Sequence, residues 1–272
     1  MLGICRTDRR TSVMQLKNIL INALFPLSCR DCGQFYHISG PYRRVPEGTS
    51  EPGDFGNIFS SLMAQHLCPV CARQFIAAES PLCMRCGLIF KSRQGEDHLC
   101  GECLQSEKLY GKARAAGVHD QALMSIMHAY KYGGKVQLAG PLSKLLTAVF
   151  EHHWQPDAID LVLPIPLHPT RFRERGFNQA YLLVRSWGDI VARDILQRKR
   201  PTSPQTGLGR KERLRNVRGA FAVRDPLSVK NKHILLVDDV YTTGATVKEC
   251  ARMLKKCNAA QVDILTVGRA IT

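Results

Sequence analysis

Two adjacent carboxylates and a threonine-rich turn form the chemically most specific segment of this sequence. Asp238 and Asp239 follow an apolar run, residues 234–237, that is typical of a buried parallel strand. The turn has the sequence Thr242, Thr243, Gly244, Ala245, Thr246, and a helix is predicted to begin near its last residue. Backbone N–H groups, hydroxyls and the helix N-terminus can converge there on one phosphate. Paired carboxylates beside a phosphate suit the hydroxyls of a ribose, often with Mg²⁺ nearby.

Eight of the eleven cysteines form four Cys-x-x-Cys pairs, which are Cys29/Cys32, Cys68/Cys71, Cys83/Cys86 and Cys100/Cys103. Two thiolates at this spacing reach adjacent corners of a tetrahedral zinc site, so eight of them predict two structural Zn²⁺ ions. The spacing leaves open whether neighbouring or interleaved pairs combine. Residues 33–67 are rich in Gly, Pro and Ser and are predicted to be a flexible insertion, which puts the site of Cys29/Cys32 in question.

The bulk composition indicates a globular protein with an affinity for polyanions. The chain has 272 residues, 44% of them hydrophobic, and a formal net charge of +15. A generic basic surface is the alternative. Thiolate–zinc chemistry predicts a reducing, cytoplasmic location. Residues 1–28 are interpreted as an extension with a short helix at 16–25, and no segment approaches the roughly 20 apolar residues of a membrane span.

Strand and helix patterns alternate after the last cysteine pair. Strands are predicted at 113–119, 159–167, 234–237 and 262–267, and helices at 121–131, 138–152, 178–194 and from about 246. This alternation predicts an α/β fold with a parallel sheet between helices. Ligands of such sheets bind at the carboxyl ends of the strands, where residues 164–175 and 238–246 both fall.

Three stretches carry a resemblance to a known family. Residues 233–246 resemble the phosphoribosyl diphosphate (PRPP) signature of type I phosphoribosyltransferases. With residues 163–179, residues 213–221 and the cysteine pairs, they are similar to the ComF/GntX family of bacterial competence and DNA-utilisation proteins. The resemblance runs from about Cys29 to the C-terminus. It implies a Cys-rich double zinc-ribbon module at 29–104 and a type I phosphoribosyltransferase-like domain at 105–272, with a basic hood over the substrate at 196–221.

The resemblance also implies a PRPP–Mg²⁺ site and transfer of a phosphoribosyl group. The turn would hold the 5′-phosphate, and Asp238 and Asp239 would hold the ribose. A loop at 167–176 would hold the pyrophosphate. The residues implied in that region are Arg171, Arg175, Gly176 and Asn178, with Arg175 and the two aspartates as the catalytic group. Thr242 stands where purine salvage enzymes of this fold carry an aspartate, which argues against purine salvage and leaves the acceptor open.

Two other functions remain compatible with these residues. Residues 171–218 contain thirteen Lys or Arg against four Asp or Glu. A non-catalytic module could therefore sense PRPP or a nucleotide and bind single-stranded DNA or a DNA-translocating helicase, with Phe172, Phe177 or Phe221 stacking on bases. An amino- or pyrimidine-directed salvage enzyme is the third reading. Lys131 either reaches the site or ends a solvated helix.

Overall fold

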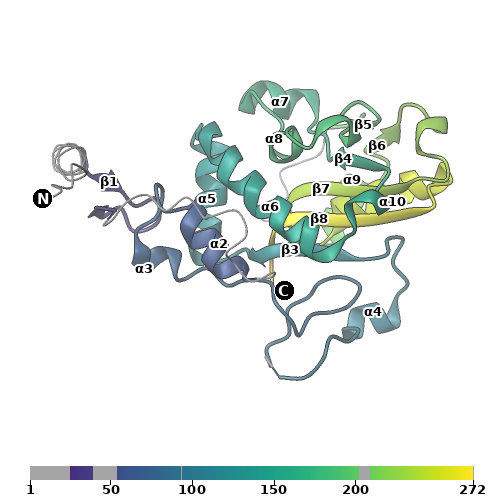
Figure 1. Ribbon diagram of the computed structural model, residues 1–272. Coiled ribbons are helices and arrows are strands. Elements are labelled where there is room, and N and C mark those ends of the chain that lie inside the picture. Colours follow the sequence, from purple (N-terminus) through teal and green to yellow (C-terminus); the bar gives the residue numbers. More distant parts are fainter. Residues whose placement is uncertain (1–24, 39–53, 93, 202–208, 272) are drawn as a thin grey trace, which may run out of the picture.

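A four-stranded parallel sheet forms the centre of the computed structural model, which describes residues 25–38, 54–92, 94–201 and 209–271 (Figure 1). The strands lie in the order β3-β8-β7-β4. Their bounds are β3 Ala113–Val118, β4 Leu161–Pro164, β7 His233–Tyr241 and β8 Gln261–Arg269. Apolar runs in β7 and β8 are buried on both faces, as the central strands of a parallel sheet require. The predicted α/β fold is confirmed.

Helices cover both faces of this sheet. Helices α5 Gln121–Tyr132, α6 Ala139–His153 and α8 Gln179–Val184 contribute to one hydrophobic core, and α10 Ala245–Lys256 contributes to the other. Successive residues of β7 alternate between the two, because Leu235 and Val237 belong to the first core and Ile234 and Leu236 to the second. The 3₁₀ turns are η1 Val136–Leu138, η2 Pro156–Ala158, η3 Gly188–Ile190 and η4 Leu227–Val229.

Two predicted elements near the cavity described below were wrong. The helix expected over 178–194 ends at Val184, and Gly188 with a φ of 77° begins a separate 3₁₀ turn. The pyrophosphate loop expected over 167–176 contains helix α7 Pro169–Arg175. Pro169 is at the first helical position, where its missing N–H costs no hydrogen bond, and Gly176 ends the helix in the left-handed conformation.

The basic segment after residue 195 forms three short elements, of which α9 and β6 pack against α10. Strand β5 Leu196–Arg198 pairs antiparallel with β6 Phe221–Val223, and α9 Arg210–Val217 lies between them in the chain. Residues 202–208 lie outside the described residues. That this segment closes over a substrate stays a prediction.

The chain before β3 contains short elements around the cysteines. They are β1 Leu27–Ser28, β2 Phe35–Tyr36, α2 Phe55–Leu62, α3 Pro69–Ala72 and α4 Gly101–Gln105. The prediction of a flexible insertion was wrong for residues 54–67, because α2 packs against α6 and buries Phe55 and Phe59. Residues 39–53 and nearly all of the predicted extension 1–28 lie outside the described residues.

The outer edge of the sheet is covered by a short extended segment, residues 76–78. Ala77 pairs antiparallel with Gly117 of β3, the Ala78 N–H donates to Ala116 O (3.0 Å), and the Val118 N–H donates to Ile76 O (2.8 Å). A Cβ on Gly117 would collide with the Phe75 ring. The cysteine-bearing part of the chain is thus joined to the sheet by backbone hydrogen bonds. Among the described residues, no helix is long and apolar enough to cross a membrane.

Candidate active-site cavity and cysteine clusters

A cavity of about 680 Å³ opens at the carboxyl edge of the sheet. The turn after β7, helix α7, the end of α5 and strand β5 all contribute to its wall. The predicted residues that line it are Asp238, Asp239, Thr242, Gly244, Ala245, Thr246, Arg171, Arg175 and Asn178. Thr243 and Gly176 are not among its lining residues. The chain order and the parallel strands therefore bring nearly all the predicted residues to one place.

The turn between β7 and α10 has the geometry of an anion cradle. Gly244 has a φ of 71°, and a Cβ there would collide with the Tyr241 side chain, so only glycine fits. The Thr243 hydroxyl accepts from the Ala245 N–H (3.4 Å), so this side chain stabilises the turn itself. Ala245, Thr246 and Val247 begin α10 and line the cavity. Their N–H groups form the positive end of the helix dipole.

The acidic pair lies within β7, which extends four residues beyond the predicted end at Val237. The Asp239 N–H donates to Asp238 Oδ1 (2.9 Å), and Asp239 Oδ1 forms an ion pair with Lys131 Nζ (2.8 Å). Gln179 Nε2 donates to Asp239 Oδ2 (3.4 Å). Burial, with the neighbouring charge of Asp239, raises the pKa of Asp238 to about 7. One of the two carboxyl groups thus titrates near neutral pH.

Four cationic side chains line the cavity, of which sequence reasoning identified two. Arg175 lies over the Tyr132 ring (4.9 Å to the centroid), and Arg171 pairs with Glu174 (3.7 Å). Lys131, which could have ended a solvated helix, instead reaches the cavity and pairs with Asp239. Arg198 was missed, because one arginine within a uniformly basic stretch carries no distinguishing signal.

Arg198 is held in place by an aromatic ring. Its guanidinium lies over the ring of Phe221 (5.3 Å). Burial lowers the pKa of Arg198, and the charge of Asp238 opposes that shift. Asn178 has a structural role, since its Oδ1 accepts from the Tyr181 N–H (3.4 Å) as the N-cap of α8 and its Nδ2 donates to Ile165 O (3.1 Å).

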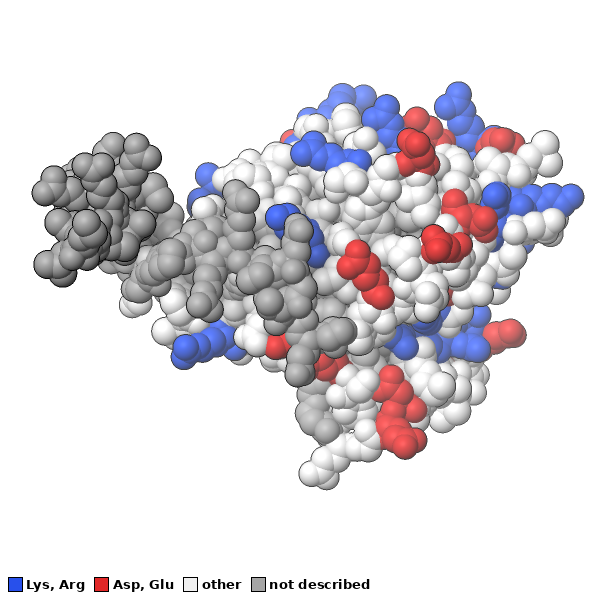
Figure 2. All heavy atoms as spheres, viewed as in Figure 1, with Lys and Arg blue, Asp and Glu red and all other residues white. Residues whose placement is uncertain are grey.

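Of the three phenylalanines expected to stack on bases, only Phe172 is well exposed, at 48%. Phe221 is buried in the core, so the expectation was wrong for this residue. Phe177 is half-buried and packs against Tyr130. Lys and Arg side chains, with some Asp and Glu among them, line the upper edge of the view in Figure 2, where Figure 1 places α7 and β5.

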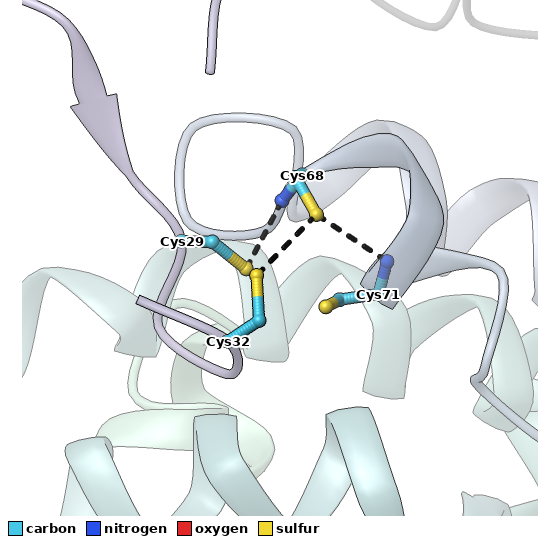
Figure 3. Close-up of side chains that lie close together, drawn as sticks. All are labelled: Cys29, Cys32, Cys68 and Cys71. Carbon is cyan, nitrogen blue, oxygen red and sulfur yellow. Dashed lines mark hydrogen bonds between the residues drawn. The ribbon is translucent and has the colours of Figure 1, made fainter. Parts of the chain in front are cut away.

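The first cysteine cluster joins Cys29, Cys32, Cys68 and Cys71, whose sulfur atoms point toward one another (Figure 3). Cys32 and Cys68 Sγ are 3.9 Å apart, close to the separation of about 3.8 Å that tetrahedral Zn–S bonds of about 2.3 Å require. The Cys68 N–H donates to Cys29 Sγ (3.3 Å). Although burial opposes ionisation, backbone donors lower the pKa of Cys29 to about 7. The questioned pair Cys29/Cys32 thus belongs to a well-formed cluster.

The second cluster joins Cys83, Cys86, Cys100 and Cys103, all buried. Cys86 and Cys100 Sγ are 3.7 Å apart, and the N–H groups of Cys86 and Cys100 donate to Cys83 Sγ. Burial opposes ionisation here too, but these donors lower the pKa of Cys83 to about 6. Neighbouring pairs therefore combine. Both clusters could hold Zn²⁺, which would crosslink the segments that carry its ligands.

Comparison with known proteins identifies a domain family and several named relatives. The phosphoribosyl transferase domain family matches residues 179–270. "DNA utilization protein YhgH" of Escherichia coli K12 is 30% identical over 217 residues, covering 75% of this chain and 91% of that protein. This chain belongs to the ComF/GntX family.

Other members of the family match over a similar length. "Competence protein F" of Haemophilus influenzae is 29% identical, and the match covers 75% of this chain and 90% of that protein. "Competence protein ComFC" of Streptococcus pneumoniae is also 29% identical, and the match covers 70% of this chain and 89% of that protein. A solved "allosteric regulatory enzyme of purine biosynthesis" is 19% identical with a TM-score of 0.32, covering 49% of this chain and 25% of that one, and so loose a similarity adds nothing to the assignment.

Some residues of the cavity wall lie outside the range that matches the phosphoribosyl transferase domain family. It begins at Gln179, so Lys131 and the arginines of α7 lie before it. The acidic pair, the turn and Arg198 lie within it. The cavity of this ComF-family protein therefore combines residues inside the matched range with cations from helices that precede it.

Proposed function

We propose that this ComF-family protein binds PRPP with Mg²⁺ in the cavity and transfers the phosphoribosyl group to an acceptor. The proposal is supported chiefly by one observation: an acidic pair and a helix N-terminus share a cavity with four cationic side chains. A ligand that matches this arrangement carries hydroxyl groups between two separate phosphate groups. PRPP is such a molecule.

In the proposed complex the 5′-phosphate accepts from the N–H groups that begin α10 and from the hydroxyls of Thr242 and Thr246. The ribose hydroxyls donate to Asp238 and Asp239. The pyrophosphate lies against Arg171, Arg175, Arg198 and Lys131, so Lys131 turns from Asp239 toward the ligand. Arginine forks suit phosphate oxygens and stabilise the charge that a leaving pyrophosphate develops.

In the proposed reaction the bond between C1 of the ribose and the pyrophosphate oxygen breaks, and pyrophosphate keeps the electron pair. A new bond forms from C1 to a nucleophilic atom of the acceptor, which loses a proton. Mg²⁺, when bound, would supply positive charge to the pyrophosphate, and Asp238 and Asp239 are the residues that would hold it. Thr242 replaces the aspartate of purine salvage enzymes, so we do not propose a purine as the acceptor.

The binding step is tested by calorimetry with PRPP and Mg²⁺. Asp239→Asn should weaken binding at least tenfold, because it removes a charged acceptor from the cavity. Asp189→Asn, at an exposed position of η3 away from the cavity, is the matched control and should bind like the wild type. Unchanged affinity in Asp239→Asn would refute the assigned site. Catalysis is tested by pyrophosphate release in the presence of candidate acceptors.

A second candidate function is binding of single-stranded DNA, in keeping with the names of the relatives. Helix α7 supports it, since Phe172 is exposed between Arg171 and Arg173. Base stacking on Phe172 and phosphate contacts to the arginines would give affinity without sequence preference. Phe172→Ala should then weaken oligonucleotide binding, and affinity should fall steeply with salt. Salt-sensitive binding without pyrophosphate release would favour a non-catalytic module.

A further inference from the structure

Arg269, the last residue of β8, is a buried cation without a paired carboxylate among the described residues. The residue is only 8% exposed, and its Nε and Nη1 have no hydrogen-bond partner. Its Nη2 donates to Cys86 Sγ (3.5 Å), and the guanidinium also interacts with the Tyr241 side chain. Burying a charge is costly unless an opposite charge lies close by. A negative charge close to Arg269 would therefore stabilise its buried guanidinium.

The second cysteine cluster can supply that charge. Cysteines bind Zn²⁺ as thiolates, so four of them with one divalent ion carry a net charge of about −2. Cys86 is a member of this cluster and is also the sulfur that Arg269 contacts. The guanidinium thus lies where it could act as the counterion of this cluster once Zn²⁺ is bound.

On its other side Arg269 reaches the wall of the cavity. Its guanidinium lies over the ring of Tyr241, 4.3 Å from the centroid, and the Ala270 N–H donates to Tyr241 O (2.9 Å). The Tyr241 hydroxyl shares a hydrogen bond with the Tyr110 hydroxyl (2.9 Å). Tyr241 lies so close to Gly244 that no Cβ would fit between them. A continuous set of contacts runs from Cys86 through Arg269 and Tyr241 to the anion cradle.

We propose that Arg269 couples the second cysteine cluster to the cavity, so that Zn²⁺ in this cluster and a phosphate in the turn stabilise each other's binding. Without the metal the guanidinium loses its counterion, and the packing of Tyr241 under Gly244 loosens. The first cluster lies elsewhere, with Asp31 accepting from Ser125 of α5 (2.5 Å), and takes no part. The proposal has two halves. The zinc half, that Arg269 stabilises Zn²⁺ in the second cluster, is independent of the proposed function. The phosphate half, that Arg269 also strengthens phosphate binding in the turn, rests on the proposed function.

The zinc half is tested by release of Zn²⁺ to a chromophoric chelator from the full-length, zinc-loaded protein. Arg269→Met should release one of two zinc equivalents at least tenfold faster than the wild type, since loss of outer partners commonly costs 10–100-fold in metal affinity. The other equivalent should keep its rate and serves as an internal control. Arg85→Met removes a cation between two ligands of the same cluster, away from the cavity lining, and should leave both rates within about twofold.

The phosphate half is tested by reciprocity. PRPP with Mg²⁺ should slow release of that same zinc equivalent in the wild type, and Arg269→Met should weaken PRPP binding at least fivefold. Wild-type release rates in Arg269→Met, or equal acceleration of both equivalents, would overturn the proposal. Should Arg269→Met fail to fold, the wild-type release rates with and without PRPP decide, and equal rates overturn it. Absence of PRPP binding in the wild type would instead refute the proposed function and leave the zinc half to stand on its own test.

Discussion

Raising the pH from 6 to 8 should tighten the binding of PRPP and Mg²⁺ about tenfold, because Asp238 has to lose a proton to accept from the ribose or approach the metal. Burial, with the charge of Asp239 beside it, raises the pKa of Asp238 to about 7. With that value about one molecule in eleven is ionised at pH 6 and about ten in eleven at pH 8. The ratio is about tenfold in affinity, or about 1.4 kcal/mol.

Calorimetry at half-unit steps of pH measures this dependence. The phosphates of PRPP also titrate near pH 6 and contribute a slope of their own. Asp238→Asn isolates that contribution, since it keeps the shape of the side chain and removes its proton. The variant should bind weakly at every pH with a shallower slope. A wild-type affinity that stays flat between pH 6 and 8, or an unchanged slope in Asp238→Asn, would show that Asp238 is not the titrating ligand.

The raised pKa of Asp238 has the opposite effect on the stability of the ligand-free protein, which should fall as the pH rises. The folded protein holds the Asp238 proton up to about pH 7, whereas an unfolded carboxyl loses it near its ordinary pKa of 3.8. Because the folded state binds more protons in this window, the contribution of Asp238 to the free energy of unfolding falls as pH rises from about 4 to 7. Urea denaturation of the wild type and Asp238→Asn should therefore diverge with pH over this range.

Three further substitutions test the turn, helix α2 and the ion pair, and the first two have control substitutions, Gly140→Ala and Phe35→Ala. Gly244→Ala should lower the free energy of unfolding by about 1–3 kcal/mol in urea denaturation, because the left-handed backbone and the Tyr241 side chain exclude a Cβ. Gly140→Ala in α6, with open space around it, should be neutral or stabilising by up to about 1 kcal/mol. Phe59→Ala should cost about 3–5 kcal/mol, since Phe59 is 0% exposed and stacks on Phe75. Phe35→Ala, 73% exposed, should change stability by less than about 0.5 kcal/mol, and equal effects of the two would refute the packing of α2. Lys131→Met removes the cation paired with Asp239, so the pH midpoint of PRPP binding should move above 7, and an unmoved midpoint would contradict the assignment.

The alternation of strands and helices could be predicted because each core strand is a short apolar run with a clear boundary. Helix α2 escaped prediction because its two buried residues, Phe55 and Phe59, lie one helical turn apart within a stretch whose composition indicates a loop. Helix α7 escaped because the family resemblance implies a loop at residues 167–176, although Pro169 is well suited to the first position of a helix.

The candidate site was predictable where it is local in sequence. The acidic pair and the turn after it occupy nine consecutive residues, 238–246, so the pattern alone places them together. Lys131 of α5 and Arg198 of β5 both lie earlier in the chain, and only the folded sheet shows that they reach the same cavity. The pairing of the cysteines has the same cause, since Cys32 meets Cys68 only where the Arg30 N–H donates to His66 O (2.9 Å) in the folded chain.

The hydrogen bonds between residues 76–78 and β3 predict how a truncated protein without the cysteine-bearing part would behave. A truncated protein that starts after the second cluster would present the free N–H and C=O groups of β3 to solvent, and such a bare margin is a template for strand addition by another copy. It would also uncover apolar side chains of α6 that α2 now shields. We therefore expect the isolated C-terminal part to self-associate. The cysteine-bearing part thus covers an edge of the sheet that would otherwise be open to strand addition.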